Sequence, residues 1–264
     1  MPSVKVNGVR IAYEEKGKGD PLLLIMGLGT PGSVWEKHLA VYARHFRCIV
    51  IDNRGTGRSE KPKGPYSIAL MADDAAGLLD RLGVSSARVA GISMGSAIAQ
   101  ELALRYPARV RSMVLVSSWA RCDTYLKELL HSFQTARETL PPGDFMRLIQ
   151  LWIYAPGYFN SSFAGMEEAK EAPPQGPATP RHAYAAHCDA CSNHDTLGRL
   201  HRIGQPCLLT VGEKDIFTPV HLSQAMASRL PHARLKVFRN AGHCHHWESL
   251  DAFNAITVKF LLEH

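Results

Sequence analysis

The stretch Ala87–Tyr106, ARVAGISMGSAIAQELALRY, decides the fold. Its first six residues form a mostly apolar run that is too short for a helix, and a helical stretch follows from Ser96. Between them lies Gly91-Ile92-Ser93-Met94-Gly95, the G-x-S-x-G pattern of a strand-to-helix turn that presents a serine hydroxyl. Such a turn needs glycines because it leaves no room for Cβ atoms beside the neighbouring strand and helix. A glycine-rich turn with an incidental serine is the competing interpretation.

Short runs of the same kind recur along the chain and predict a mostly parallel sheet. They are Leu22–Met26, Arg47–Asp52, Ser112–Ser117, Pro206–Val211 and Leu235–Phe238. Helical periods lie between most of them, and alternating strands and helices form a parallel sheet that helices cover on both faces. Residues 3–16 alternate around Asn7-Gly8, which predicts an antiparallel hairpin. We therefore expect an α/β fold with antiparallel strands at its N-terminus.

The alternation stops between residues 119 and 203. Helical spacing is present at Thr124–Glu138, Asp144–Tyr154 and His182–Leu200. Prolines crowd the segment from Pro173 to Pro180, which cannot be helical. We therefore predict a core domain formed by residues 1–118 and 204–264, with a small helical cap inserted at 119–203.

Composition excludes several classes of function. Of the 264 residues, 45% are hydrophobic and 20% are charged, as in ordinary globular proteins. No apolar run approaches the roughly 20 residues that span a bilayer, and the first residues lack the apolar segment of a secretory signal. The net charge of +6 is scattered, without a basic run. We expect a cytoplasmic protein with reduced cysteines and with neither a nucleic-acid nor a membrane partner.

A serine nucleophile needs a base and an acid, and the sequence supplies both in the order serine, acid, histidine. Asp215 follows a buried run at its C-terminal end, where parallel sheets bind ligands, and His243 follows the next run. We expect His243 to take the Ser93 proton and Asp215 to fix the imidazole tautomer. Singly, Asp215 is equally well explained by a turn, and His243 by an ordinary loop histidine. His245 and His246 are alternative bases.

The loop Gly27-Leu28-Gly29-Thr30-Pro31-Gly32 permits two interpretations. It matches G-x-G-x-x-G after a strand, and Asp52 lies at the spacing of a dinucleotide-binding unit. The predicted hairpin precedes this strand, however, and Pro31 removes a backbone N–H that a phosphate site would use. An acyl-transfer site is favoured, because the N–H groups of Leu28 and Met94 can form an oxyanion hole.

With these motifs assembled, the chain resembles the α/β-hydrolase fold superfamily over nearly its whole length. The segments that carry the resemblance are Met26–Gly29, Asp52–Ser59, Gly91–Gly95, Arg105–Pro107, Gly212–Asp215 and Gly242-His243 with Glu248. Shorter segments resemble 3-oxoadipate enol-lactonases, at Lys63–Ile68 and Tyr184–Cys188, and the aminoacrylate or carbamate hydrolase of pyrimidine breakdown, at Arg54–Gly57 and Ser118-Trp119. The sequence departs from the common pattern at Met26, where many relatives have histidine.

The resemblance implies a serine hydrolase that needs neither a metal nor an organic cofactor. Its substrate would be a small carboxylic ester or lactone, which Ser93 attacks to give an acyl-enzyme that water hydrolyses. Enol-lactone or carbamate hydrolysis on the same triad, cofactor-free C–C hydrolysis or perhydrolysis, and a receptor without turnover remain alternatives. Ser93 excludes the dehalogenases and epoxide hydrolases of this fold, which use aspartate at this position.

Several cap residues invite a functional interpretation. The segment His187–His194 has the pattern H-C-x-x-C-x-x-H, but a single CxxC within a helical stretch more often packs a helix face than binds zinc, so we expect no metal. Trp119 and Phe217 are candidates for the wall of the substrate pocket, and packing within the cap core is the alternative interpretation. Arg121 could attract an anionic substrate, although a solvated position on the cap surface is favoured.

Overall fold

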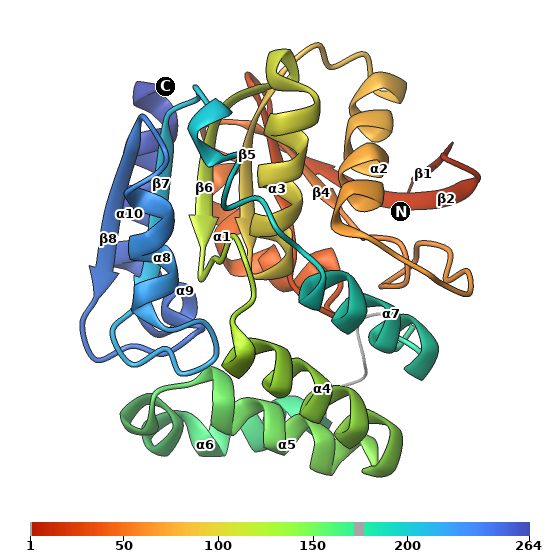
Figure 1. The fold of residues 1–264 in the computed structure, drawn as a ribbon, viewed down its shortest axis with the longest axis vertical. Coiled ribbons are helices and arrows are strands. Elements are labelled where there is room, and N and C mark those ends of the chain that lie inside the picture. Colours follow the sequence, from red (N-terminus) through yellow and green to blue (C-terminus); the bar gives the residue numbers. More distant parts are fainter. Residues whose placement is uncertain (1, 172–176) are drawn as a thin grey trace.

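The computed structural model describes residues 2–171 and 177–264, and its centre is a twisted sheet of eight strands (Figure 1). The strands are β1 (Ser3–Val6), β2 (Val9–Lys16), β3 (Pro21–Ile25), β4 (Arg47–Ile51), β5 (Ala87–Ile92), β6 (Val110–Val116), β7 (Cys207–Gly212) and β8 (Ala233–Phe238). Their order is β1-β2-β4-β3-β5-β6-β7-β8. The pairs β1–β2 and β2–β4 are antiparallel and all others are parallel, which confirms the predicted α/β fold.

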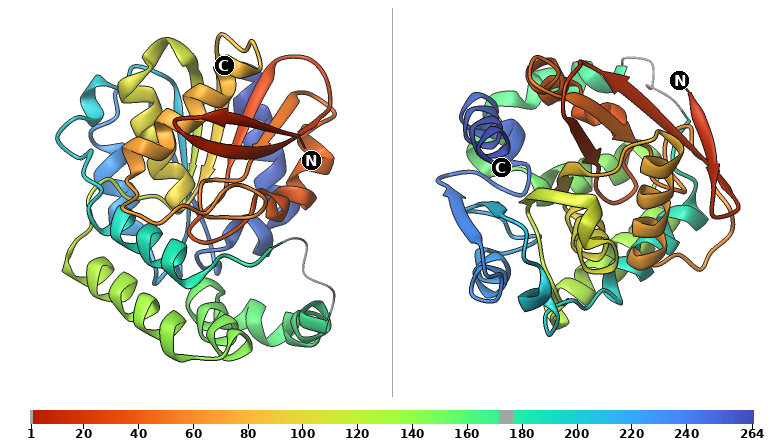
Figure 2. Two further views of the ribbon diagram at one scale, coloured as in Figure 1. Left: turned by 90° about the vertical axis from the view of Figure 1, so that its right-hand side faces the viewer. Right: turned by 90° about the horizontal axis from the view of Figure 1, so that it is seen from above.

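Helices cover both faces of this sheet, as the alternation of short runs predicts. They are α1 (Glu36–Tyr42), α2 (Ile68–Arg81), α3 (Met94–Arg105), α8 (Val220–Ala227), α9 (His245–Glu248) and α10 (Leu250–Glu263), with 3-10 turns η1 (Gly32–Trp35), η2 (Pro107–Arg109) and η3 (Leu200–Arg202). In β3, Leu22 and Leu24 pack into the cluster that includes α1 and α10, whereas Leu23 and Ile25 pack toward α2 and α3. Both faces are therefore apolar, and Figure 2 shows the two helical layers in the view from above.

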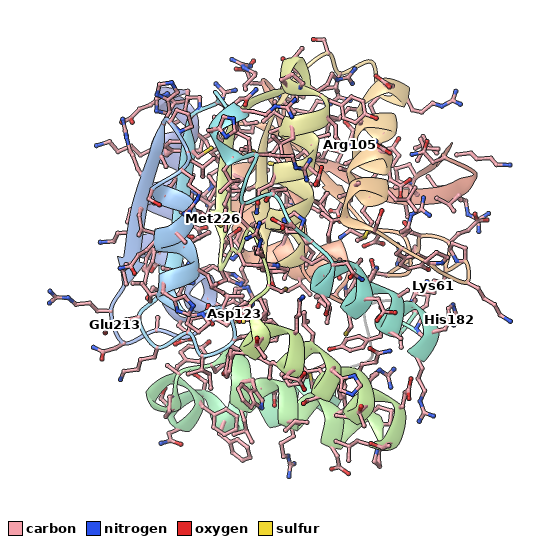
Figure 3. All side chains as sticks on the ribbon, in the orientation of Figure 1. Lys61, Arg105, Asp123, His182, Glu213 and Met226 are labelled. Carbon is pink, nitrogen blue, oxygen red and sulfur yellow. The ribbon has the colours of Figure 1, made fainter. Side chains whose placement is uncertain are left out.

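In the described part of the chain, four α-helices stand between β6 and β7, at the edge toward which the strand arrowheads point in Figure 1. They are α4 (Thr124–Thr139), α5 (Pro142–Ile153), α6 (Pro156–Glu171) and α7 (Arg181–Ser192). Asp123, at the junction of sheet and cap in Figure 3, caps α4 by accepting the Leu126 N–H at 2.8 Å. The division into a core and a cap at residues 119–203 stays a prediction.

Two details of the expected cap are wrong. The structure has a helix at Pro156–Glu171 where none is predicted, because glycines and an Asn-Ser-Ser run interrupt the apolar period there. The helix expected to reach Leu200 ends at Ser192. Asn193, Asp195, Thr196 and Gly198 have low helix propensity, and the segment pairs elsewhere instead: Arg121 bridges to Asp195, and the Thr196 N–H donates to Ala120 O at 2.8 Å.

The remaining expectations for the cap concern its proline-rich segment and its relation to membranes. Residues 177–180 form no helix, as expected, while Pro173, Pro174 and Gly176 lie outside the described residues. Across the described ranges, we find no helix with the length and apolarity that crossing a bilayer requires.

Candidate active site

Ser93 lies on a strained turn between β5 and α3. Its backbone dihedrals are φ 53° and ψ −118°, which lie in a region that residues other than glycine rarely adopt. Its N–H donates to Val116 O of the adjacent β6 at 2.8 Å, and its side chain does not cap the helix. The hydroxyl is therefore held at the N-terminus of a twelve-residue helix, where the helix dipole favours developing negative charge.

The glycines around Ser93 are required by close backbone contacts. A Cβ on Gly91 would collide with the backbone at Gly95, and a Cβ on Gly95 would collide with the Ile25 carbonyl group. On the opposite side, a Cβ on Gly27 would lie 3.3 Å from the Ser93 Cβ. The loop after β3 is thus packed directly against the serine, as an oxyanion-hole loop must be.

The acid and the histidine of the predicted triad meet. His243 Nδ1 lies 3.0 Å from Asp215 Oδ2 and 3.2 Å from Oδ1, and both side chains are buried. Asp215 also accepts the backbone N–H of Phe217 at 2.9 Å and of Thr218 at 2.8 Å. Burial raises the pKa of Asp215, but the charge and hydrogen bond of His243 and the Thr218 bonds outweigh it and hold that pKa below its ordinary value.

The end of β6 brings Ser93 and His243 to the same place. Val116 accepts the Ser93 N–H, and the next residue, Ser117, donates its hydroxyl to His243 O at 2.7 Å. Within the described residues, the Ser93 hydroxyl forms no hydrogen bond with the His243 ring. Catalytic hydrogen bonds often tighten only when substrate binds. The Ser93–His243 proton transfer therefore stays a prediction.

The two expected oxyanion donors are not used elsewhere. Within the described residues, neither the Leu28 N–H nor the Met94 N–H has a hydrogen-bond acceptor. The next amide along the loop, that of Gly29, donates instead to His187 Nδ1 at 3.3 Å. Leu28 and Met94 are therefore the amides that remain for a substrate oxygen, and their role stays a prediction.

The alternative bases have other partners. His245 Nε2 lies 3.0 Å from Thr210 Oγ1, and His246 Nδ1 lies 3.0 Å from His38 Nε2. Both residues are buried, and burial lowers the pKa of His245 to about 3. His243 is the histidine of this segment that contacts Asp215, so the geometry favours it as the base.

The expected pocket residues differ in position. The Phe217 ring centre lies 4.6 Å from that of His243, next to the site. Trp119 is buried with its ring against His194, at 6.2 Å between centres. Arg121 is exposed and pairs with Asp195 at 2.7 Å, as a cap-surface residue does. These positions favour Phe217 over Trp119 as a pocket wall.

The residues that a dinucleotide site or a zinc site would use form hydrogen bonds within the protein instead. The Asp52 carboxylate accepts the Gly32 N–H at 2.7 Å and the Arg58 N–H at 2.9 Å, so it ties two loops together instead of facing a ribose. His187 and His194 belong to separate hydrogen-bond networks. In the part of the chain that the structure describes, no three His, Cys, Asp or Glu residues are arranged to hold a metal ion.

Sequence reasoning missed Thr218 and Ser117. Thr218 donates its hydroxyl to Asp215 Oδ2 at 2.8 Å and lies 3.1 Å from His243 Nδ1, so it orients both members of the pair. Its position three residues after an aspartate, with two N–H groups turned to that carboxylate, is the spacing of an Asx-type turn. That spacing was available in the sequence. For Ser117, which contacts His243 from 126 residues away, we find no comparable pattern.

Comparison with known proteins is consistent with this geometry. A family model described as "alpha/beta hydrolase fold" matches residues 20–250, which include the turn at Ser93 and the Asp215–His243 pair. The chain belongs to the α/β hydrolase fold family. Across this family one fold carries several chemistries, so the match leaves the substrate open.

Relatives of this α/β hydrolase have different names. It is 32% identical to a protein of Azorhizobium caulinodans named carbamate hydrolase RutD, over 98% of both chains. It is 30% identical to a protein of Mycobacterium tuberculosis named non-heme bromoperoxidase BpoC, over 96% of this chain and 97% of that one. The enol-lactonase from Burkholderia xenovorans LB400 superimposes with a TM-score of 0.90 at 26% identity, covering 99% of this chain and 100% of that one.

Proposed function

We propose that the protein is a serine hydrolase that cleaves a small carboxylic ester or lactone through an acyl-enzyme. The observation that carries this proposal is the shared anchoring of Ser93 and His243 by Val116, the last residue of β6, and by the next residue, Ser117, with His243 paired to Asp215. A strained serine at a helix N-terminus beside a buried acid–histidine pair is suited to acyl transfer.

The reaction would proceed in two halves. As Ser93 Oγ bonds to the substrate carbonyl carbon, its proton passes to His243 Nε2, and the oxyanion accepts the Leu28 and Met94 N–H groups. Collapse breaks the ester bond, and the leaving alcohol takes the proton from His243. Water then gives a proton to His243 and its hydroxide to the acyl carbon. The bond from the acyl carbon to Ser93 Oγ breaks as His243 returns the proton to that oxygen, which releases the acid and restores Ser93.

Active-site labelling tests this proposal. A fluorophosphonate probe followed by intact mass measurement should add one phosphonyl group to the wild type and none to Ser93→Ala, while p-nitrophenyl acetate turnover falls by about 10³-fold or more in Ser93→Ala. Ser228→Ala, at an exposed serine of the core, is the matched control and should label fully. Full turnover in Ser93→Ala would refute the proposal, and absence of any turnover in the wild type would favour a receptor.

A substrate that carries a carboxylate is the second candidate, and Arg137 of α4 favours it. Its guanidinium is half-buried, donates to Thr179 O at 3.1 Å and lies 5.5 Å from the Phe145 ring centre. Phe145 packs on Tyr184, which lies against the loop after β3. Among the described residues Arg137 has no carboxylate partner. Arg137→Gln should raise KM for a carboxylate-bearing lactone and leave that for p-nitrophenyl acetate unchanged.

A further inference from the structure

The loop that would donate the Leu28 N–H is a four-residue turn. The Thr30 N–H donates to Gly27 O at 3.3 Å, and Gly29, the third residue, has φ 64°. An i to i+3 hydrogen bond with a positive φ at the third position is characteristic of a type II turn. A type II turn differs from a type I turn by a flip of its central peptide, which here joins Leu28 to Gly29.

His187 of α7 holds that central peptide. Its side chain is fully buried, with Nδ1 3.3 Å from the Gly29 nitrogen and Nε2 2.8 Å from Arg54 O. An amide N–H only donates and a carbonyl only accepts, so the ring must be neutral, with its proton on Nε2. Burial favours the same state and lowers the pKa of His187 to about 4.

We propose that His187 is a positioning residue for the oxyanion hole, holding the Leu28–Gly29 peptide so that the Leu28 N–H stays directed to the substrate. This inference rests on the proposed function. It assigns a catalytic consequence to a cap residue that does not itself contact the reacting atoms.

The bonds around this peptide explain why the orientation depends on His187. On the other side, the Thr30 hydroxyl donates to Leu28 O at 3.0 Å. A flipped peptide would lose both bonds and turn the Leu28 carbonyl toward Nδ1, so that one lone pair would face another. The Leu28 N–H belongs to the preceding peptide, which joins Gly27 to Leu28, so His187 acts on it indirectly, by fixing the Leu28 Cα that the two peptides share.

The surroundings of the ring fix His187 in turn. Arg54, whose carbonyl accepts from Nε2, is ion-paired with buried Asp74, and the Tyr66 ring centre lies 5.4 Å from that of His187. On the same helix, Tyr184 fills the space beside Gly29, where a Cβ would lie 2.6 Å from the ring. The groups that face His187 are thus one balanced ion pair and neutral phenols. The Arg54 carbonyl favours a protonated imidazole, but burial outweighs it and keeps the pKa of His187 low.

Two substitutions separate the two bonds of His187. In His187→Asn, the side-chain oxygen can take the place of Nδ1 and still accept the Gly29 N–H, while the donor to Arg54 is lost. In His187→Gln, the longer side chain can still reach Arg54 with its amide N–H₂, while the acceptor at the Nδ1 position is lost. His182→Asn is the matched control: it lies on the same helix, and its ring contacts Lys61 O at 3.0 Å (Figure 3).

The readout is the rate of acylation, measured as the p-nitrophenol burst from p-nitrophenyl acetate, together with KM and the melting temperature. Loss of one oxyanion donor slows acyl transfer about 10²–10³-fold, so a misplaced donor in His187→Gln should slow the burst by about tenfold or more, with KM changed less than about threefold. His187→Asn and His182→Asn should stay within about threefold of the wild type. If His187→Gln does not fold, Thr30→Val perturbs the same peptide and should slow the burst alike.

The inference would be overturned if His187→Asn and His187→Gln lost the same fraction of the acylation rate, in proportion to the fall in their melting temperatures. His187 would then be a packing residue. An unchanged burst in His187→Gln would overturn it as well. A wild type that gives no burst and no label at Ser93 would instead refute the proposed function, and the role of this turn with it.

Discussion

The strained backbone at Ser93 predicts a difference in stability between two variants, which can be measured without a substrate. Ser93→Ala and Ser93→Gly both remove the hydroxyl, but only the glycine variant removes the Cβ that makes φ 53°, ψ −118° unfavourable. Ser96, three residues later, is also buried but sits inside α3 with ordinary helical geometry. The pair Ser96→Ala and Ser96→Gly therefore measures the usual cost of glycine in this helix.

The expected size follows from two opposing effects. At Ser96, glycine should be less stable than alanine by about 1 kcal/mol, because glycine has more freedom in the unfolded chain and fits a helix poorly. At Ser93 the same cost is offset by relief of about 1–3 kcal/mol of backbone strain. The alanine-to-glycine change should thus be about 1–3 kcal/mol more favourable at Ser93 than at Ser96.

Urea denaturation of the four variants measures this difference, and thermal melts should show it as roughly 2–4 °C for each kcal/mol in a chain of this size. The comparison cancels the loss of each hydroxyl, since both members of a pair lack it. An equal penalty for glycine at the two positions would show that the turn stores no strain, and the argument that the fold holds Ser93 in a forced conformation would fail.

Three further outcomes are expected. Asp215→Asn should keep the fold but lower kcat about 10³–10⁴-fold, because an amide favours the wrong imidazole tautomer; kinetics beside a melt would show it. Stability should be full above pH 6.5 and fall as pH drops toward 4, because buried histidines with pKa values of about 3 to 4 must take up protons on unfolding; urea midpoints at pH 7, 6 and 5 would show this loss. Asp74→Ala should cost about 3–5 kcal/mol in urea denaturation, because it leaves the Arg54 guanidinium buried and unpaired.

The sequence predicts those parts of the molecule that local chemistry determines. The turn at Asn7-Gly8, the short strands and the G-x-S-x-G turn each depend on neighbours within a few residues, and the structure has them close to where they are expected. The run Leu235–Phe238 differs in burial, because β8 is an edge strand with mostly exposed or partly exposed residues. Asp215 and His243 could be predicted because each follows a strand of one parallel sheet, and such strand ends meet at a single edge.

The missed features depend on contacts between distant residues. The bond from Gly29 to His187 joins positions 158 residues apart, and nothing in the helical spacing around His187 indicates its partner. The pairing of Asp195 and its neighbour with the segment after β6, just beyond the end of α7 at Ser192, also joins distant parts of the chain. Such pairings are set by how the cap packs on the sheet.

Segments of the predicted cap form hydrogen bonds with both loops of the candidate site. The Cys244 N–H, next to His243, donates to Ile153 O at 2.9 Å. Glu248 accepts the N–H of Ala155 at 3.3 Å and of Gly242 at 3.0 Å, so its carboxylate links the cap to the histidine loop. On the other side, His187 of α7 accepts the Gly29 N–H, so the predicted cap contacts the segments that carry the proposed base and the proposed oxyanion donor. A substitution in these cap segments is therefore expected to change kcat as well as substrate fit, since it moves groups that act in the transition state.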